Sequence, residues 1–330
     1  MMRTLLFLLT TLFVLSGEKG PGKKYSNADS GYELFETYHQ IHILKNGNHV
    51  ASYLYDSSFL KPILYPVHSP SGFMIERRFP FAMIEGESHD HPHHTGIFFT
   101  YGSEGEVNGN SFWANQQQQT RIRHRAVEQM QAGSREAILR TKADWIGRNG
   151  NVILEEDRTM TFSGNGNHQA IDFSIRLKAI GENVVFRDTK EGMFGIRVAD
   201  WLSEDHGTGT YLNSNGDTAE AGVWGKRAEW VRLQGTHEGR TVGIVIMNHP
   251  GSVNYPTYWH ARGYGLFAAN PLGQSVFLEG HGIKNPEPFN FTIRQGDTAH
   301  FLFRMIVYEE NYSPEEIETD FQSFGSSTLK

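Results

Sequence analysis

The sequence predicts an all-β protein, built as a large antiparallel β-sandwich with a short C-terminal helix. Three observations point to this class. Glycine is frequent, with 35 residues in a chain of 330, which favours many tight turns over long helices. Several segments alternate apolar and polar residues with a period of two, and clusters of turn-forming residues separate them. We find no internal repeat of fixed period, which argues against a propeller.

Three segments are the clearest predicted strands. Apolar residues occupy every second position at 171–177, 242–246 and 301–307, so each segment should bury one face. Turn clusters lie at 163–167, 213–217 and 295–297. The clearest helix start has Ser313 as its cap, Pro314 at the first helical position and two acids after it, and this helix should run to about Phe324. No linker divides the chain, so we expect one domain over residues 25–330.

The N-terminus is predicted to be a secretory signal peptide over residues 1–16. Arg3 precedes an apolar run from Leu5 to Leu15, about half of the ~20 residues that a membrane-spanning helix needs, and the small residues Ser16 and Gly17 follow. A polar spacer would occupy residues 17–24. The alternative is a buried N-terminal strand. We expect an exported mature chain, periplasmic or secreted, with no membrane-spanning segment.

Composition excludes several kinds of partner and chemistry. The chain has no Cys, which removes disulfides, a lipoprotein anchor, a thiolate nucleophile and Cys-ligated metals. The net charge is −7 and no basic cluster is present, so nucleic acid is not an expected partner. Nucleotide-binding glycine motifs and the Gly-x-Ser-x-Gly elbow are missing, so neither a nucleotide cofactor nor serine hydrolase chemistry is expected.

The strongest chemical signal is a histidine cluster at residues 89–94, where four histidines fall within six positions. On an extended strand His89, His91 and His93 would share one face, and Asp90 and His94 the other. Imidazole can donate or accept a proton or ligate a metal near neutral pH, and Pro92 places the stretch at an edge, a bulge or a loop. The alternative is an exposed polar loop, or histidines satisfied by backbone carbonyls. A divalent metal on His91 and His93 also stays open, although the Glu of a cupin pattern is missing.

Further candidates lie downstream. Glu191 could be a buried acid and Arg197 a substrate clamp, with an ordinary ion pair as the alternative. Residues 248–271 mix aromatic side chains with Asn, His and Arg, as sugar sites do, because aromatic faces stack on C–H surfaces while polar groups bond hydroxyls. Core packing is the alternative for any single Trp. The candidates in these and neighbouring segments are Trp113, Trp224, Trp230, His249, Asn254, Trp259, His260, Arg262, Tyr264 and Asn270.

These segments resemble the methane oxygenase PmoA-like family, a domain of unknown function. The resemblance rests on DHPHHTG at 90–96, NGNSFW at 108–113, KEGMFGIRVAD at 190–200, WGKRAEW at 224–230 and the segment 248–273. More distantly, the family is similar to galactose-mutarotase-like supersandwich proteins, and this likeness implies the fold. Glu279 lies late in the chain, as the catalytic base does in the mutarotases. The site implied by the resemblance comprises Arg77, Asp90, His91, His93, His94, Glu191, Arg197, His249, Trp259, His260, Arg262 and Asn270.

The combined interpretation is an exported carbohydrate-active enzyme that transfers protons on a sugar, as an epimerase or mutarotase, or as a lyase or hydrolase. A histidine from 91, 93 or 94 would donate a proton, and Glu191 or Glu279 would remove the opposing one. Arg77, Arg197 or Arg262 would bind hydroxyls or a uronate carboxylate. The catalytic candidates are therefore His91, His93, His94, Glu191 and His260. The alternatives are a non-catalytic glycan-binding module and a His-ligated metal-dependent oxygenase or hydrolase.

Overall fold

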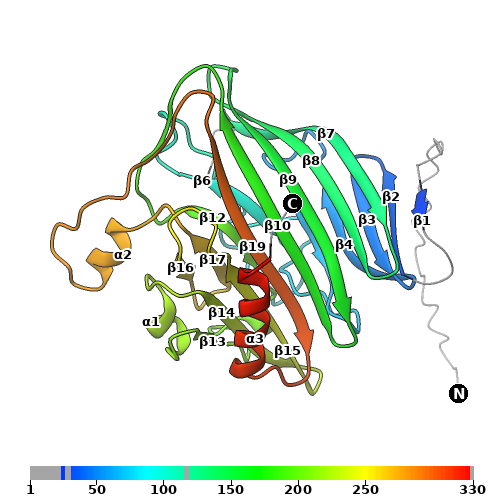
Figure 1. The fold of residues 1–330 in the computed structure, drawn as a ribbon. Helices are drawn as coiled ribbons and strands as arrows, with labels where there is room; N and C mark the ends of the chain where they lie inside the picture. Colours follow the sequence, from blue (N-terminus) through cyan, green and yellow to red (C-terminus); the bar gives the residue numbers. More distant parts are fainter. Residues whose placement is uncertain (1–23, 27–30, 115–118, 328–330) are drawn as a thin grey trace, which may run out of the picture.

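The computed structural model describes residues 24–26, 31–114 and 119–327, and Figure 1 shows the fold. The predicted signal peptide at 1–16 lies outside these residues, as does all of the predicted spacer except Lys24. The described residues form two large antiparallel sheets, a two-stranded sheet and a few short helices. The predicted class, a large antiparallel β-sandwich with a short C-terminal helix, is confirmed. None of the helices in the described ranges is long and apolar enough to cross a membrane.

The first large sheet has nine strands and carries most of the residues discussed below. Six strands that follow one another in sequence are joined at one edge by three strands from much later in the chain. This order pairs the strand after the histidine cluster with the strand that begins at Gly192, which in turn pairs with the strand that begins at Leu266. In spatial order the strands are β1 (Lys24–Ser26), β2 (Tyr32–Thr37), β3 (Gln40–Lys45), β4 (Asn48–Leu54), β5 (Ile63–Val67), β6 (Ile97–Tyr101), β12 (Gly192–Arg197), β17 (Leu266–Asn270) and β16 (Tyr258–Ala261).

The second large sheet has eight strands, among them the long curved strands coloured green and orange in Figure 1. All three segments with two-residue alternation form strands of this sheet. The predicted turn at 163–167 connects β9 (Val152–Asn165) and β10 (His168–Ala179) as a hairpin. Both predictions are confirmed. In spatial order the strands are β13 (Thr210–Asn213), β14 (Trp230–His237), β15 (Arg240–Asn248), β19 (Thr298–Glu309), β10 (His168–Ala179), β9 (Val152–Asn165), β8 (Glu136–Ile146) and β7 (Arg121–Ala132).

The remaining elements are small. The two-stranded sheet pairs β11 (Val184–Phe186) with β18 (Phe291–Ile293), and the short helices are η1 (Asp200–Leu202), α1 (Ala219–Val223) and α2 (Ser275–Gly280). Figure 1 shows α2 and the loop after it projecting from the side of the molecule.

The predicted C-terminal helix is α3 (Pro314–Gly325). The Ser313 hydroxyl accepts a hydrogen bond from the Glu316 backbone N–H, and the Glu316 carboxylate accepts one from the Ser313 N–H. This capping box satisfies amide groups that the first turn leaves without partners. Phe321 and Phe324 pack against buried side chains of β14, β15 and β19, so α3 covers part of the second sheet (Figure 1).

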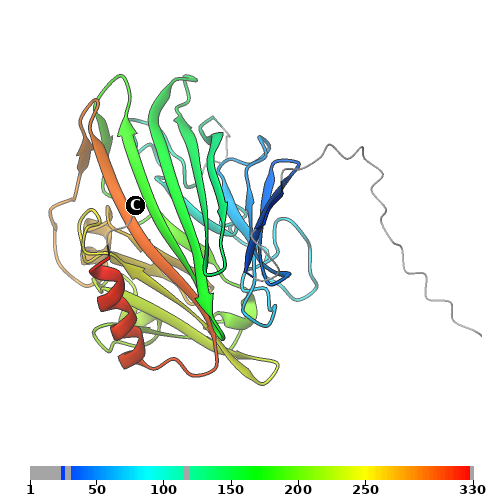
Figure 2. The ribbon, with the colours of Figure 1, turned by 45° about the vertical axis from the view of Figure 1, so that its right-hand side comes forward.

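The main core lies between the two large sheets, which Figure 2 shows from a second side. Phe194 of β12 stacks on Phe303 of β19 with ring centroids 4.6 Å apart, and Phe173 of β10 lies 4.7 Å from Phe194. These contacts join strands of both sheets. Ile244 and Phe303, which the alternation placed in the core, are fully buried.

The opposite face of the first sheet carries its own apolar cluster. Phe99 of β6 belongs to the core between the sheets, whereas Phe98 belongs to this second cluster together with Trp113 and Leu266. Successive residues of a strand point to opposite faces, so the outward positions of β6, β12, β17 and β16 share one surface. The polar side chains of the candidate site lie on this outer face and on the loops that border it.

Candidate functional site

A buried arginine pair on one aspartate forms the centre of the site. Arg77 Nη1 donates a hydrogen bond to Asp90 Oδ1 at 2.6 Å, and Arg197 Nη2 donates to the same oxygen at 2.6 Å. Arg197 Nη1 also reaches Asp90 Oδ2 at 3.1 Å. The side chains of Arg77 and Arg197 are 0% and 1% exposed, whereas that of Asp90 is 38% exposed. The carboxylate therefore lies at the surface on a base of two guanidinium groups.

Backbone pairing explains why the two arginines meet. Arg197 is the last residue of β12, and the Arg77 backbone N–H donates to the Arg197 carbonyl oxygen at 3.2 Å. Ser88 adds a further link, since its hydroxyl accepts from Arg197 Nη2 at 3.1 Å and donates to Asp200 Oδ1 at 2.7 Å. Burial alone would raise the pKa of Asp90, but hydrogen bonds from Arg197 and His91 and the charges of both arginines outweigh it and lower that pKa. Asp90 is thus held as an anion.

His91 extends from this cluster toward solvent. Its Nδ1 pairs with Asp90 Oδ2, and its side chain is 43% exposed. The imidazole lies parallel to the ring of Tyr264, with centroids 5.0 Å apart and 4° between the planes. The backbone of His91 has a φ of 41°, in the left-handed region that non-glycine residues rarely adopt. Such conformations concentrate at functional sites, where surrounding contacts maintain them.

His93 and His94 lie deeper and are held neutral. Burial, followed by the charge of Lys61, lowers the pKa of His93 to about 3. Burial lowers the pKa of His94 well below its ordinary value, and neither of its ring nitrogens has a hydrogen-bond partner among the described residues. The His94 ring lies 4.9 Å from that of His91 and 5.3 Å from that of Trp113. Trp113 is itself buried in the outer-face apolar cluster.

One glycine lets this segment pack closely on the sheet. Gly96 has a φ of 59°, and a Cβ atom there would collide with the carbonyl oxygen of Leu64 on β5. Only glycine takes that conformation at that approach without strain. The turn therefore fixes His94 against the start of β6.

The loop after β16 supplies the other side of the site. The guanidinium of Arg197 lies 4.8 Å from the Tyr264 ring centroid, and that of Arg262 lies 5.6 Å from it. Arg262 Nε also forms an ion pair with Glu220 Oε1 at 2.7 Å, and its guanidinium lies 5.9 Å from the Trp224 ring. Burial raises the pKa of Tyr264 to about 12, so its hydroxyl stays protonated at neutral pH.

Glu191 and His260 border the same area. Glu191 pairs with the neighbouring ammonium of Lys190, and its charge acts on the hydroxyl of Tyr264. His260 Nδ1 lies 2.9 Å from the Lys190 carbonyl oxygen, a distance that fits an N–H donating to it. Burial, then the charges of Lys190 and Arg262, lowers the pKa of His260 to about 3. His260 is only 2% exposed, so it belongs to the packed interior more than the sequence suggested.

The structure therefore brings together twelve of the predicted residues, and it places five others and Glu279 elsewhere. Those brought together are Arg77, Asp90, His91, His93, His94, Trp113, Glu191, Arg197, Trp224, His260, Arg262 and Tyr264.

The other predicted residues make structural contacts. Trp230 donates to Glu318 of α3, and His249 packs on Phe324 of the same helix. The remaining three, Asn254, Trp259 and Asn270, hydrogen-bond backbone carbonyls at Pro271, Ala228 and Thr189, respectively, and Glu279 is exposed on α2.

Lys61 is a prominent neighbour that the sequence did not single out. It lies in the loop between β4 and β5, is 5% exposed, and donates from Nζ to the carbonyl oxygen of His93 at 2.8 Å. A lone Lys in a polar loop gives no sequence signal, because its burial depends on the residues 93–98 that fold over it.

The metal alternative gains no support from the side-chain arrangement. In the described part of the chain, no three His, Asp or Glu side chains are grouped so that they could hold a metal ion. Nδ1 of His91 is directed at Asp90, and the ring centroids of His91 and His93 are 5.8 Å apart.

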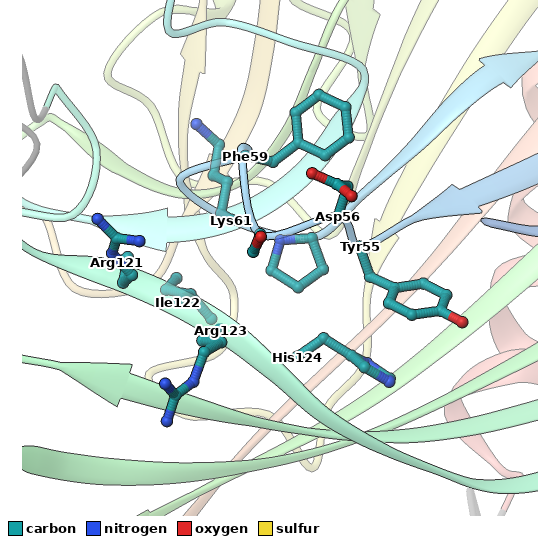
Figure 3. Close-up of a pocket in the computed structure, with 10 residues that line it drawn as sticks. Tyr55, Asp56, Phe59, Lys61, Arg121, Ile122, Arg123 and His124 are labelled. Atoms are coloured by element: carbon teal, nitrogen blue, oxygen red, sulfur yellow. The ribbon is translucent and has the colours of Figure 1, made fainter. Parts of the chain in front are cut away.

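Hollows also lie beside the site and away from it. Figure 3 shows a cavity of about 20 Å³ between the loop after β4 and the start of β7, with Tyr55 and His124 on one side of it. A polar groove of about 540 Å³ crosses the outer face of β7 to β10, and it is lined by residues such as Arg140, Asp157 and Arg176.

With this geometry in place, comparison with known proteins gives a family and a set of similar folds. The model of DUF6807, a family of unknown function, matches residues 40–322. The chain belongs to the DUF6807 family. The matching family model is not a PmoA-like one, so the resemblance to the PmoA-like family stays a prediction. No curated protein matches the chain.

The chain is also similar to solved structures, among them the following three. The GH36 α-galactosidase AgaA from Geobacillus stearothermophilus is 10% identical with a TM-score of 0.42, and the match covers 88% of this chain and 41% of the galactosidase. The Slr1438 protein from Synechocystis sp. PCC 6803 is 10% identical with a TM-score of 0.33, covering 91% of this chain and 100% of that one. A galactose mutarotase related enzyme from Lactobacillus acidophilus is 12% identical with a TM-score of 0.31, covering 88% and 97%.

Proposed function

We propose that the site around Asp90 binds a sugar and moves a proton on it, with His91 as the group that transfers the proton. The observation that carries this proposal is the pairing of Asp90 with His91. Asp90 is held by two buried arginines, its pKa is lowered, and its second oxygen pairs with Nδ1 of an imidazole that is 43% exposed.

This pairing determines which imidazole nitrogen is available. An ionised carboxylate accepts the proton on Nδ1, so the neutral ring carries its free lone pair on Nε2. The same arrangement orients the histidine in Ser-His-Asp triads, where the aspartate fixes the tautomer. Nε2 of His91 can then remove a proton from a substrate and return it, which is the chemistry that epimerisation and mutarotation require.

The neighbouring histidines are less suited to donating protons. His93 and His260 have pKa values lowered to about 3, chiefly by burial, and are neutral at pH 7. A neutral imidazole can still polarise an oxygen by donating a hydrogen bond from its N–H. His91 is therefore the proton donor that this site favours among the three predicted at 91, 93 and 94.

Part-exposed polar side chains around His91 would bind hydroxyls. Arg262, Glu220, Lys190 and Glu191 have side chains between 21% and 36% exposed, so their polar groups are accessible at the surface. Carboxylate and guanidinium groups together provide acceptors and donors for sugar hydroxyls.

The test is turnover on a panel of reducing sugars. Proton NMR in D2O follows anomeric exchange, epimerisation and deuterium uptake for the wild-type protein and for His91→Ala. The matched control is His89→Ala, because His89 is also exposed and lies two residues away, with its ring packed on Phe79. We expect His91→Ala to lose at least about a hundredfold in rate, the usual scale of acid–base catalysis, while His89→Ala keeps it.

Two results would contradict the proposal. Equal rates for both variants would remove His91 from the chemistry. Sugar-induced shifts in melting temperature without any turnover would instead favour the non-catalytic glycan-binding module.

A further inference from the structure

Positive charge exceeds negative charge in the interior of the site. Lys61, Arg77 and Arg197 are buried cations, and the carboxylate that directly pairs with either arginine is Asp90. Asp200 lies nearby, where it accepts from Ser88 and its charge acts on Arg77. Glu76 is also buried, but its carboxyl group accepts from the Val67 backbone N–H, and burial raises its pKa well above its ordinary value, so it is not counted as a charge here. Even when Asp200 is counted, three cations face two carboxylates in this part of the described chain.

The other charges at the site cancel in pairs. Arg262 pairs with Glu220, and Lys190 pairs with Glu191. The buried imidazoles of His93, His94 and His260 are held neutral, so they add no charge at pH 7. The unbalanced charge is therefore the ammonium of Lys61.

Lys61 has few of the contacts that a buried ammonium requires. Its Nζ donates one hydrogen bond to the His93 carbonyl oxygen and lies 5.2 Å from the Phe98 ring centroid. No carboxylate of the described residues lies within ion-pair distance of it. Burying an ammonium without an anion is costly, and burial lowers the pKa of Lys61 to about 8, which still leaves it mostly protonated at pH 7.

The ammonium faces the site and not the small cavity beside the lysine. Figure 3 shows the amino group of Lys61 turned away from His124 and Tyr55. That cavity, at about 20 Å³, is the size of one water molecule. On the other side, the charge of Lys61 reaches the imidazoles of both His93 and His94.

We propose that Lys61 binds a carboxylate of the substrate, so that the sugar taken by this site is a sugar acid such as a hexuronate. This inference rests on the proposed function and specifies its substrate class. The carboxylate would complete the charge balance of the site by accepting hydrogen bonds from the ammonium, beside the part-exposed ring of His93. Neutral sugars would leave the ammonium unpaired and should bind more weakly.

The experiment compares matched acids and neutral sugars. Calorimetric titration with D-glucuronate against D-glucose, and with D-galacturonate against D-galactose, isolates the contribution of the carboxylate. For the wild-type protein we expect at least about tenfold tighter binding of one acid than of its neutral parent, the scale of one charge-assisted hydrogen bond. Lys61→Met keeps the length and packing of the stem without the charge and should bring the two affinities together, while Lys61→Arg should keep much of the preference.

The experiment includes a control variant away from the site and a second substitution at Lys61. Lys142→Met removes a cation that pairs with Glu128 on β7, away from the site, and should leave the preference unchanged. If Lys61→Met does not fold, Lys61→Gln supplies the same comparison with a polar side chain. Equal affinity of the wild-type protein for acids and neutral sugars overturns the inference, as does a preference that survives removal of the charge.

Failure of this inference is distinct from failure of the proposed function. Turnover of neutral sugars with no advantage for acids would retain the function and reject the role of Lys61. Absence of binding and turnover for every sugar, acid or neutral, would reject both.

Discussion

Replacing Asp90 by Asn should destabilise the protein by about 2–3 kcal/mol. The substitution keeps the size of the side chain and one acceptor oxygen, but it removes the charge that faces Arg77 and Arg197. Both guanidinium groups are almost fully buried, at 0% and 1% side-chain exposure. Breaking a buried ion pair from one side costs about 3–5 kcal/mol, and we reduce that figure because the carboxylate of Asp90 is 38% exposed and solvent screens it.

Asp157→Asn is the matched control. Asp157 pairs with Arg140 at 3.4 Å, and the two side chains are 35% and 44% exposed, so this loss should cost less than about 1 kcal/mol. Urea unfolding at pH 7 measures both variants, with equal m-values as evidence that the unfolding reaction itself is unchanged. Equal destabilisation by the two substitutions, within about 0.5 kcal/mol, would refute the view that Asp90 balances buried charge.

Three further predictions concern the core, acid sensitivity and export. Phe303→Ala should lower the free energy of unfolding by about 3–5 kcal/mol, because it opens a cavity in the core. His91→Ala changes an exposed side chain and should lower it by less than about 1 kcal/mol. Similar urea midpoints for the two variants would contradict the assigned core. Stability should fall as the pH drops below about 6.5, because burial lowers the pKa of His93 and of His260 to about 3, so that the unfolded chain binds protons that the folded protein does not. Each such histidine lowers the free energy of unfolding by up to ~1.4 kcal/mol per pH unit. A flat stability profile between pH 7 and 5 would contradict this prediction. Protein from the native host should begin between about residues 15 and 22 if the apolar N-terminal run is a signal peptide, and a mature chain that starts at Met1 would contradict export.

The fold was largely readable from the sequence, because its strongest signals are local. The alternation at 171–177 and 301–307 reflects strands with one buried face, and both strands lie where it placed them. The helix start at Ser313 was equally clear from the sequence, since the residues of the capping box lie within four consecutive positions, 313–316. The order of strands in each sheet was not readable, because it depends on which distant segments pair.

The site was only partly readable for the same reason. The histidine cluster at 89–94 marked the segment that carries Asp90 and His91, yet the sequence could not show that Asp90 joins two arginines or that His91 is exposed while His94 is buried. Trp230 and Trp259, which aromatic content singled out, lie in packed regions, where their indole N–H groups donate to Glu318 and to the Ala228 carbonyl. The sequence did not predict Lys61 as a site residue, because its burial results from tertiary contacts that leave no local sequence pattern.

A crystal structure with the best-binding sugar of the panel tests the central claim most directly. The account predicts that a sugar oxygen or the carbon that exchanges its proton lies within about 3–3.5 Å of His91 Nε2, with the sugar between His91 and Arg262. For a sugar acid, the carboxylate should lie within hydrogen-bond distance of the Lys61 ammonium. A sugar seated instead in the polar groove over β7 to β10, with His91 untouched, would contradict the assignment of the site.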